Sequence, residues 1–195
     1  MSQPSDPPEE FDEWAAGLAS ADAEAPPLIV IVDTCVLVDI KKHVSVGGGA
    51  QWDLLSAMMG LVEEGRLIFP SQVHKELTEM QHPDAPGAWT GKAYTKVKIK
   101  GASDQALSDI LAVAPDLIDP DAEDSFEKAD PYILALAFEL RSADDPYDAV
   151  VATTDAVDRH PRIALATACG LCGVPVWDFD AFVQWVLDPD PSALG

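Results

Sequence analysis

Hydrophobic positions along this chain fall into two kinds of segment: short unbroken runs, and longer stretches with helical spacing. The run LIVIV at 28–32 is wholly apolar and rich in β-branched residues, which is typical of a strand buried on both faces of a parallel sheet. Similar short runs predict further strands at 66–69, 148–154 and 173–179. We therefore expect a sheet of buried strands separated by longer connections.

The longer stretches predict a helix between most of these strands. The predicted helices span residues 34–42, 51–64, 72–80, 103–113, 129–142, 160–169 and 180–187. Gly65 is expected to end the second helix, and Ser71 is expected to cap the third. Residues 81–101 contain Pro, Gly and Trp89 followed by four lysines, so we expect a long loop or a hairpin-like insertion there.

Strands that alternate with helices predict an α/β fold with a central parallel sheet covered on both faces. The 195 residues suit one domain with an extra segment. We place this domain at residues 28–187. Residues 1–27 are rich in Pro, Asp, Glu and Ala and are expected to form a flexible acidic arm, and residues 188–195 form a tail.

Composition narrows the function classes. A hydrophobic content of 48% allows a full core, and no apolar run is long enough to cross a membrane. The acidic N-terminus has no apolar core of a secretory signal, and the three cysteines fit a reducing compartment, so we expect a cytoplasmic protein. The net charge of −22 argues against a simple phosphate-binding surface, although a metal site concentrates carboxylates by design.

Four acidic residues occupy positions where chemistry is expected in an α/β sheet. Asp33 and Asp155 follow two predicted strands, Asp130 opens a predicted helix, and Glu76 lies in the first turns of another. Because ligands bind outside the carboxyl ends of such strands, these four acids are expected to meet at one edge of the sheet. Clustered carboxylates must take up protons or bind cations, and oxygen ligands favour Mg²⁺ or Mn²⁺. Such a metal can polarise a phosphodiester and activate water.

Four segments carry a family resemblance. VDTCVLVDI, FPSQVHKEL, ADPYILALAFEL and VVATTDAV resemble, in this order, the four motifs of the PIN-domain family, and GVPVWDFDAFV is similar to the family's last strand and helix. The match covers roughly residues 28–187. Within the family, the chain most resembles the VapC-like toxins of toxin–antitoxin pairs.

This resemblance implies a three-layer α/β/α PIN-like fold and a metal-dependent endoribonuclease that hydrolyses RNA phosphodiesters with Mg²⁺ or Mn²⁺. It assigns metal binding and catalysis to Asp33, Glu76, Asp130 and Asp155. Thr34 and Thr153 match supporting positions of the first and fourth motifs. A cognate antitoxin and a homodimer are further partners that the family implies, besides the RNA substrate.

The chain departs from the family pattern in one position and leaves two assignments open. Cys35 stands where Asn or Ser usually follows Asp-Thr, and a thiol is a poor donor, so we expect a weaker hydrogen bond there. Glu79 competes with Glu76 for the second motif, and Asp158 competes with Asp155 for the fourth.

Basic residues and cysteines outside the motifs have simpler explanations beside functional ones. One hypothesis is that an arm contacts RNA or an antitoxin through four lysines; the alternative is a solvated loop. These lysines are Lys92, Lys96, Lys98 and Lys100. Cys169 and Cys172 form a CxxC without a second pair, so core packing is expected.

Two rival functions remain. A haloacid-dehalogenase-like phosphatase also begins with an Asp after a buried strand, but it needs a second Asp two residues later, where this chain has Cys35. A catalytically weak PIN-like module that binds a partner protein fits the acidic composition. Metal titration discriminates between the second rival and an active nuclease.

Overall fold

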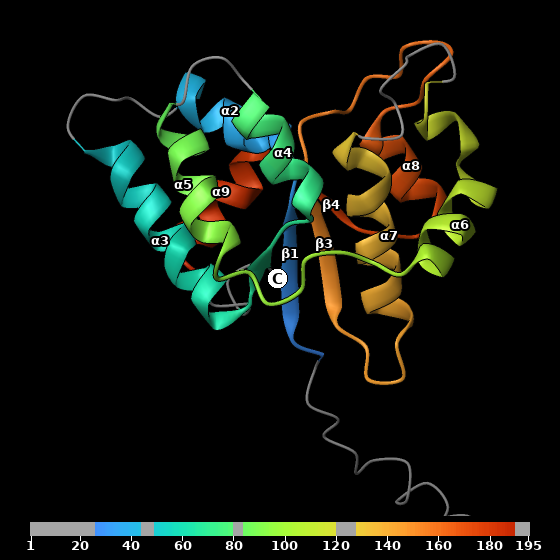
Figure 1. Cartoon of the computed structure of the whole chain (residues 1–195), viewed down its shortest axis with the longest axis horizontal. Coiled ribbons are helices and arrows are strands. Elements are labelled where there is room, and N and C mark those ends of the chain that lie inside the picture. The colour runs from blue at the N-terminus through green and yellow to red at the C-terminus, as the bar shows by residue number, and fades with distance from the viewer. Residues whose placement is uncertain (1–25, 44–48, 80–83, 120–127, 190–195) are drawn as a thin grey trace, which may run out of the picture.

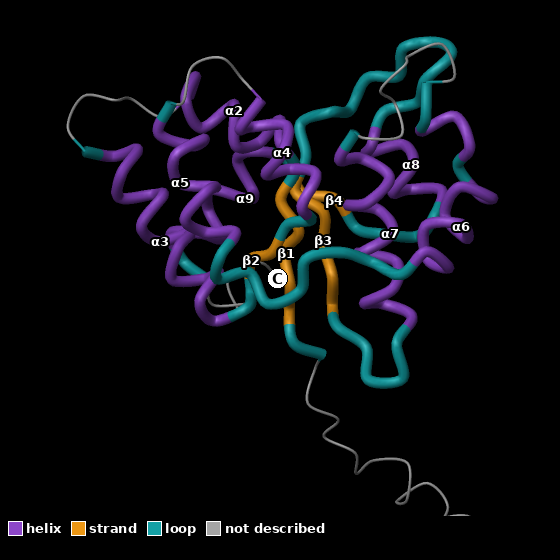
Figure 2. Tube along the Cα trace, viewed as in Figure 1, coloured by secondary structure: helices purple, strands orange, loops and turns teal. Residues whose placement is uncertain are grey.

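The central sheet has four parallel strands. The computed structural model describes residues 26–43, 49–79, 84–119 and 128–189. Its strands are β1 (Leu28–Val32), β2 (Leu67–Ile68), β3 (Asp148–Ala152) and β4 (Val176–Trp177). They pair in the order β2-β1-β3-β4, and every pairing is parallel (Figure 2). The prediction of a buried parallel sheet is confirmed, although β2 and β4 are shorter than the runs that predicted them.

Helices cover both faces of this sheet. They are α2 (Thr34–His43), α3 (Ala50–Glu64), α4 (Ser71–Glu79), α5 (Ala85–Tyr94), α6 (Asp104–Val113), α7 (Ala129–Ser142), α8 (Leu165–Leu171) and α9 (Phe179–Leu187). Helices α2, α3, α5 and α9 lie on one side of the strands, and α6, α7 and α8 lie on the other (Figure 1). This arrangement is the expected three-layer α/β/α fold.

The two central strands position the edge at which the acidic motifs end. β1 and β3 pair without offset, from Leu28 beside Asp148 to Val32 beside Ala152. The amide of Asp33 continues this ladder by donating to the carbonyl of Ala152 at 3.0 Å. Four of the five residues in each strand are buried, which holds both strands rigidly in the core. Whatever follows β1 therefore lies directly beside whatever follows β3.

The expected loop at residues 81–101 is wrong for half of its length, because α5 lies within it. Asp84 caps this helix, its side chain accepting a hydrogen bond from the amide of Gly87 at 2.9 Å. Pro86 lies in the first turn, where its missing amide hydrogen costs nothing. Trp89 and Ala93 are one helical turn apart and both are buried. Trp89 is thus a core residue packed near Phe69, with ring centroids 6.0 Å apart.

Two smaller predictions also need correction, and a third is confirmed. The helix expected at 160–169 begins only at Leu165, because a tight turn closed by mutual backbone hydrogen bonds between Arg159 and Arg162 precedes it. Ser71 does not cap α4 but is its first residue, and its hydroxyl donates to the side chain of Gln72 at 3.0 Å. Gly65 does end α3, in the left-handed conformation that glycine favours.

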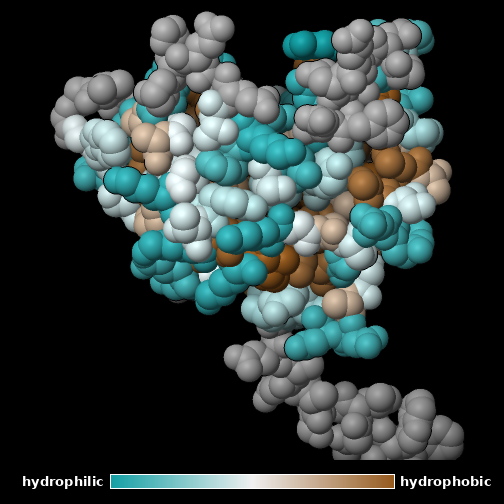
Figure 3. All heavy atoms as spheres, viewed as in Figure 1, coloured by the Kyte–Doolittle hydropathy of each residue, from teal (hydrophilic) through white to brown (hydrophobic). Residues whose placement is uncertain are grey.

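The surface of the described residues is mixed in character. Hydrophilic residues cover much of the face drawn in Figure 3, with a hydrophobic band near its lower centre and a patch over α6 and α8. No helix in the described ranges is long and apolar enough to cross a membrane. Most of the expected acidic arm and of the tail lies outside the described residues.

Candidate active site

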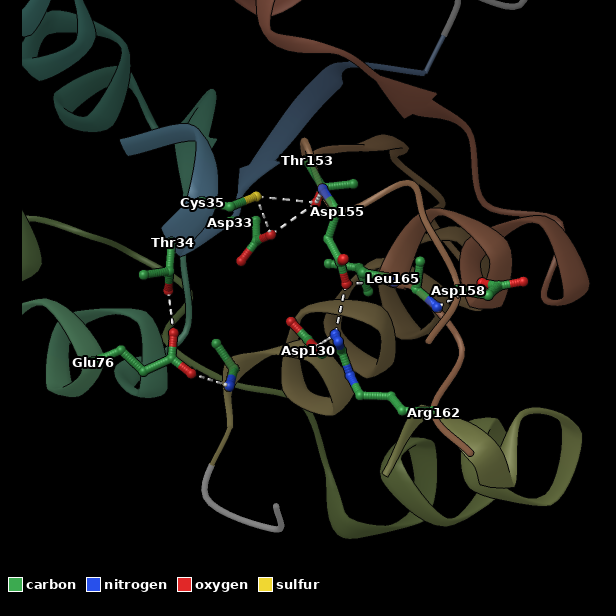
Figure 4. A network of polar contacts seen from close by, with 12 residues as sticks. Asp33, Thr34, Cys35, Glu76, Asp130, Thr153, Asp155, Asp158, Arg162 and Leu165 are labelled. Carbon is green, nitrogen blue, oxygen red and sulfur yellow. Dashed lines mark hydrogen bonds and ion pairs between the residues drawn. The ribbon is translucent and has the colours of Figure 1, made fainter. Parts of the chain in front are cut away.

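A polar cleft of about 420 Å³ opens at the carboxyl ends of β1 and β3. Its walls come from α2, the middle of α4, the start of α7 and the segment after β3. The lining residues are Asp33, Thr34, Cys35, Val38, Asp39, Lys42, Glu76, Asp130, Thr154, Asp155, Arg159 and Arg162. Figure 4 shows that the four predicted acids converge on this cleft from separate elements. The structure thus brings together side chains that are far apart in the sequence.

Asp33 forms the floor of the cleft and is only 3% exposed. Its Oδ2 accepts hydrogen bonds from Cys35 Sγ at 2.7 Å and from Thr153 Oγ1 at 2.8 Å. No described residue donates to its Oδ1. Burial, reinforced by the charges of Asp130 and Glu76, raises the pKa of Asp33 to about 7 even though both hydrogen bonds oppose the shift. A carboxylate in this position gains much from a nearby cation.

Cys35 supplies the hydrogen bond that the sequence led us to expect would be weak. Besides donating to Asp33, its sulfur accepts from the amide of Thr154 at 3.1 Å and lies 3.3 Å from Thr153 Oγ1. Burial and the adjacent Asp33 carboxylate raise the pKa of the thiol to about 12, so the thiol keeps its proton. A neutral thiol remains a donor and orients Asp33 from below.

Glu76 is fixed by hydrogen bonds at both oxygens. Its Oε1 accepts from the amide of Ala129 at 2.9 Å, and its Oε2 accepts from the hydroxyl of Thr34. These contacts tie α4 to the first residues of α2 and α7. Glu76 therefore contributes negative charge to the cleft and also stabilises its walls. Thr34 thus contacts Glu76, and its supporting role in the site stays a prediction.

Asp130 and Asp155 share one cation. Nη2 of Arg162 donates to Oδ2 of both acids, at 2.6 Å for Asp155. Asp155 Oδ2 also accepts from the amide of Leu165 at 3.1 Å, which caps α8. Burial raises the pKa of Asp130, with Arg162 opposing the shift and Asp155 and Glu76 adding to it. Thr153 connects this side of the cleft to Asp33, since its Oγ1 also accepts from the amide of Asp155 at 3.0 Å.

Asp33 and Asp130 both line the cleft, and each has one carboxylate oxygen that accepts no hydrogen bond from a described residue (Figure 4). Among the described residues, no three His, Cys, Asp or Glu side chains lie close enough to enclose a metal ion by themselves. Mg²⁺ does not require such a cage, because it keeps several waters and commonly uses one or two carboxylates. Two carboxylates with raised pKa values therefore fit a hydrated divalent cation, with Glu76 and Asp155 at the margins.

The competing acids are separated by their positions. Asp155 lines the cleft, whereas Asp158 does not and instead accepts from the amide of Ala164 at 2.8 Å. The side chain of Glu79, the other competitor, lies outside the described residues. Cys169 is buried and Cys172 half-buried, as core packing requires, and neither forms a disulfide.

The four lysines at 92–100 do not line the cleft. Lys96 pairs with Glu63, and Lys98 donates to the carbonyl of Glu64 at 2.8 Å. Lys100 lies over the ring of Tyr94, 4.6 Å from its centroid, and its carbonyl accepts from the amide of Ser71. The segment thus runs beside α3 and the start of α4. The hypothesis that it contacts RNA or an antitoxin stays a prediction.

Sequence reasoning missed several members of the cleft, most of all Arg162. Its interaction was hidden because residues 160–169 were expected to be helical. Asp39 and Lys42 were also missed, although a signal existed. The residues at 35, 38, 39 and 42 follow the spacing of one helical face, and all four line the cleft. A polar pair on the same face as Cys35 could have been assigned to the site from this spacing alone.

No protein-family model matches the sequence, and no curated protein aligns with it significantly.

Proposed function

We propose that the chain is a metal-dependent endoribonuclease of the PIN-domain type, which hydrolyses RNA phosphodiesters with Mg²⁺ or Mn²⁺. One observation carries this proposal: four acids from four separate motifs line one cleft. The α/β/α fold with its parallel sheet agrees with the fold that the resemblance implies. A cleft of this charge attracts cations rather than anions in the absence of metal.

The roles of the residues follow from their contacts. Asp33 and Asp130 would hold the cation, which when bound would polarise the phosphodiester and lower the pKa of a nearby water. Cys35 and Thr153 orient Asp33, and Thr34 with the amide of Ala129 orients Glu76. Asp155 accepts from the start of α8 and so holds the turn that carries Arg162.

The basic side chains of the cleft support a phosphate-containing substrate. Lys42, Arg159 and Arg162 all line it, although the chain as a whole carries a net charge of −22. Lys42 pairs with Asp39 at 2.7 Å and Arg162 pairs with Asp130 and Asp155, whereas Arg159 has no ion pair with a described residue and would be the first to contact a phosphate. A toxin of a toxin–antitoxin pair, with a cognate antitoxin and a homodimer, is the finer proposal, and only the resemblance supports it.

A partner-binding module without activity is the second candidate. Arg162 favours it, because its ion pairs already neutralise part of the acidic cluster. The phosphatase hypothesis has less support, since Cys35 occupies the position of the second Asp and is fully engaged with Asp33 and Thr154.

A substrate comparison separates the three functions. The full chain with Mn²⁺ is incubated with a labelled single-stranded RNA, with DNA of the same sequence, and with p-nitrophenyl phosphate. We expect internal cleavage of the RNA. Turnover of the small ester alone would indicate a phosphatase. Absence of any turnover, together with no thermal stabilisation by Mn²⁺, would indicate a silent module.

A further inference from the structure

Arg162 holds the two acids that lie on one side of the cleft. A single guanidinium nitrogen bonds to both Asp130 and Asp155 (Figure 4). The side chain is 26% exposed, so the ion pairs are only partly screened by solvent. Within the described part of the chain, no other Lys or Arg forms an ion pair with any of the four predicted acids.

The backbone around Arg162 is built to hold this position. Arg159 and Arg162 exchange backbone hydrogen bonds of 2.9 and 2.8 Å across a tight turn. Asp158 secures the exit of the turn through the amide of Ala164, and Asp155 secures the start of α8 through the amide of Leu165. Arg162 therefore lies on a turn that two hydrogen bonds hold in place, and one of their acceptors is Asp155, which Arg162 also binds.

We propose that Arg162 is an internal counter-ion, which keeps Asp130 and Asp155 together in the metal-free protein. A divalent cation that binds between Asp33 and Asp130 must overcome the charge of this arginine. The inference rests on the proposed function, because it concerns the same cation. Without Arg162, partly buried acids on neighbouring elements would repel one another. With Arg162 in place, a cation beside Asp130 meets a like charge bound to the same carboxylate.

The electrostatic environment agrees with this role. Burial alone would lower the pKa of Arg162, but Asp130 and Asp155 outweigh it and raise that pKa. The guanidinium therefore stays charged, and its attraction for Asp130 cannot be removed by deprotonation. Only a competing cation, or protonation of the acids, releases these contacts. Arg162 thereby sets how tightly the cleft binds metal.

Arg159 provides a matched control. It lies on the same turn and lines the same cleft, but it forms no ion pair with any described residue. Neutralising either arginine removes one positive charge from the cleft. Only the change at Arg162 also removes the ion pairs with Asp130 and Asp155. A difference in Mn²⁺ affinity between the two variants therefore measures the effect of these ion pairs, apart from the effect of losing one positive charge.

The test is a calorimetric titration of the full chain with Mn²⁺, without RNA, for the wild type, Arg162→Gln and Arg159→Gln. The Arg162→Gln change removes the charge-assisted hydrogen bond that holds Asp130 in the metal-free state, so the cation no longer has to compete with it. We therefore expect Arg162→Gln to bind Mn²⁺ roughly ten-fold more tightly than Arg159→Gln. We expect the opposite order for stability in EDTA, with Arg162→Gln melting at the lower temperature. Saturating Mn²⁺ should close this gap.

Each result decides between the proposals. Equal Mn²⁺ affinities of the two Gln variants, or weaker binding by Arg162→Gln, would overturn the role of Arg162 while leaving the metal site intact. Failure of every variant to bind Mn²⁺ would overturn the proposed function together with the inference. If Arg162→Gln does not fold in EDTA, Arg162→Lys keeps the charge but loses the planar guanidinium that bonds to both acids. Its Mn²⁺ affinity should then exceed that of the wild type, and an affinity equal to or weaker than that of the wild type would overturn the role of Arg162.

Discussion

The Cys35 thiol donates a hydrogen bond to Oδ2 of Asp33, with the sulfur 2.7 Å from the oxygen. This contact lowers the pKa of Asp33 against a larger upward shift caused by burial. The thiol therefore takes the hydrogen-bonding position beside Asp33, where the motif that this segment resembles has Asn or Ser. It orients the buried carboxylate and makes that carboxylate easier to ionise.

Removing this donor should shift the pH dependence of Mn²⁺ binding to higher pH. In Cys35→Ala, Asp33 loses a hydrogen bond to its charged form, so its pKa rises further and Mn²⁺ binding requires a higher pH. Cys35→Ser restores a donor and should move the midpoint of the pH dependence back. The midpoint is read from Mn²⁺ affinity between pH 5 and pH 9. A midpoint that is the same in Ala and Ser variants would show that the thiol has no influence on Asp33.

Asp33 should make the metal-free protein less stable as pH rises. Its pKa of about 7 lies above the ordinary 3.8, so the folded state holds a proton that the unfolded state releases between these pH values. Stability is therefore highest below pH 4 for this group and falls up to about pH 7, by at most about 4 kcal/mol. Asp33→Asn should remove this fall and be the more stable protein at pH 8 in EDTA. Urea unfolding at pH 5 and pH 8 measures the difference.

Proton competition predicts the opposite trend for metal. Mn²⁺ should raise the melting temperature more at pH 8 than at pH 6, because protonated Asp33 must lose its proton before the cation binds. The pH-dependent part of this shift should become smaller in Asp33→Asn, in which Asp130 is the remaining proposed ligand with a raised pKa. A melting-temperature shift that is constant over this range in the wild type would mean that Asp33 does not contact the metal.

Glu76 should matter for stability as well as for activity. Glu76→Ala leaves the amide of Ala129 and the hydroxyl of Thr34 without their acceptor, at a cost of roughly 1–3 kcal/mol. Glu76→Gln keeps one acceptor oxygen and should recover part of this loss. Lys75→Ala, at the exposed neighbouring position, serves as the control. Equal unfolding free energies for the Glu76→Ala and Lys75→Ala variants would contradict the linking role.

The lysines at 92–100 and the basic residues of the cleft should differ in their effect on RNA binding. Three of the four lysines contact α3 or Tyr94, so replacing all four with Ala should leave the salt dependence of RNA binding unchanged. Replacing Lys42 and Arg159, which line the cleft, should flatten that dependence. Binding isotherms at several salt concentrations compare the two variants. A flatter slope in the four-lysine variant would support contact between these lysines and RNA.

Much of the fold could be predicted because its strands are wholly apolar. LIVIV and AVVA indicate buried parallel strands from composition alone, and the acids that follow them are placed by topology rather than by detailed packing. Asp33 and Asp155 could be placed at the cleft for that reason, Glu76 and Asp130 from their helices, and Thr34 from the motif resemblance alone. Thr153 could be assigned too, although it lies beneath Asp33 instead of lining the cleft.

The rest depended on contacts between distant residues. α5 is only weakly amphipathic, and its formation depends on a capping Asp84 and on the burial of Trp89. The local sequence around these two residues does not distinguish a helix from a loop. Arg162 reaches the cleft because a tight turn replaces the first part of a predicted helix. A hydrogen-bonded turn of this kind leaves no periodic signal in the sequence.

We propose that Asp33 belongs to a cation-dependent RNA-cleaving site. This proposal is tested by the rate of cleavage of a labelled RNA by the full chain in Mn²⁺, for wild type, Asp33→Asn and Asp144→Asn, the last being an exposed acid outside the cleft. We expect cleavage by wild type and Asp144→Asn, at least about a hundred-fold less by a folded Asp33→Asn protein, and none in EDTA. Full activity of Asp33→Asn, or undiminished cleavage in EDTA, would contradict the account.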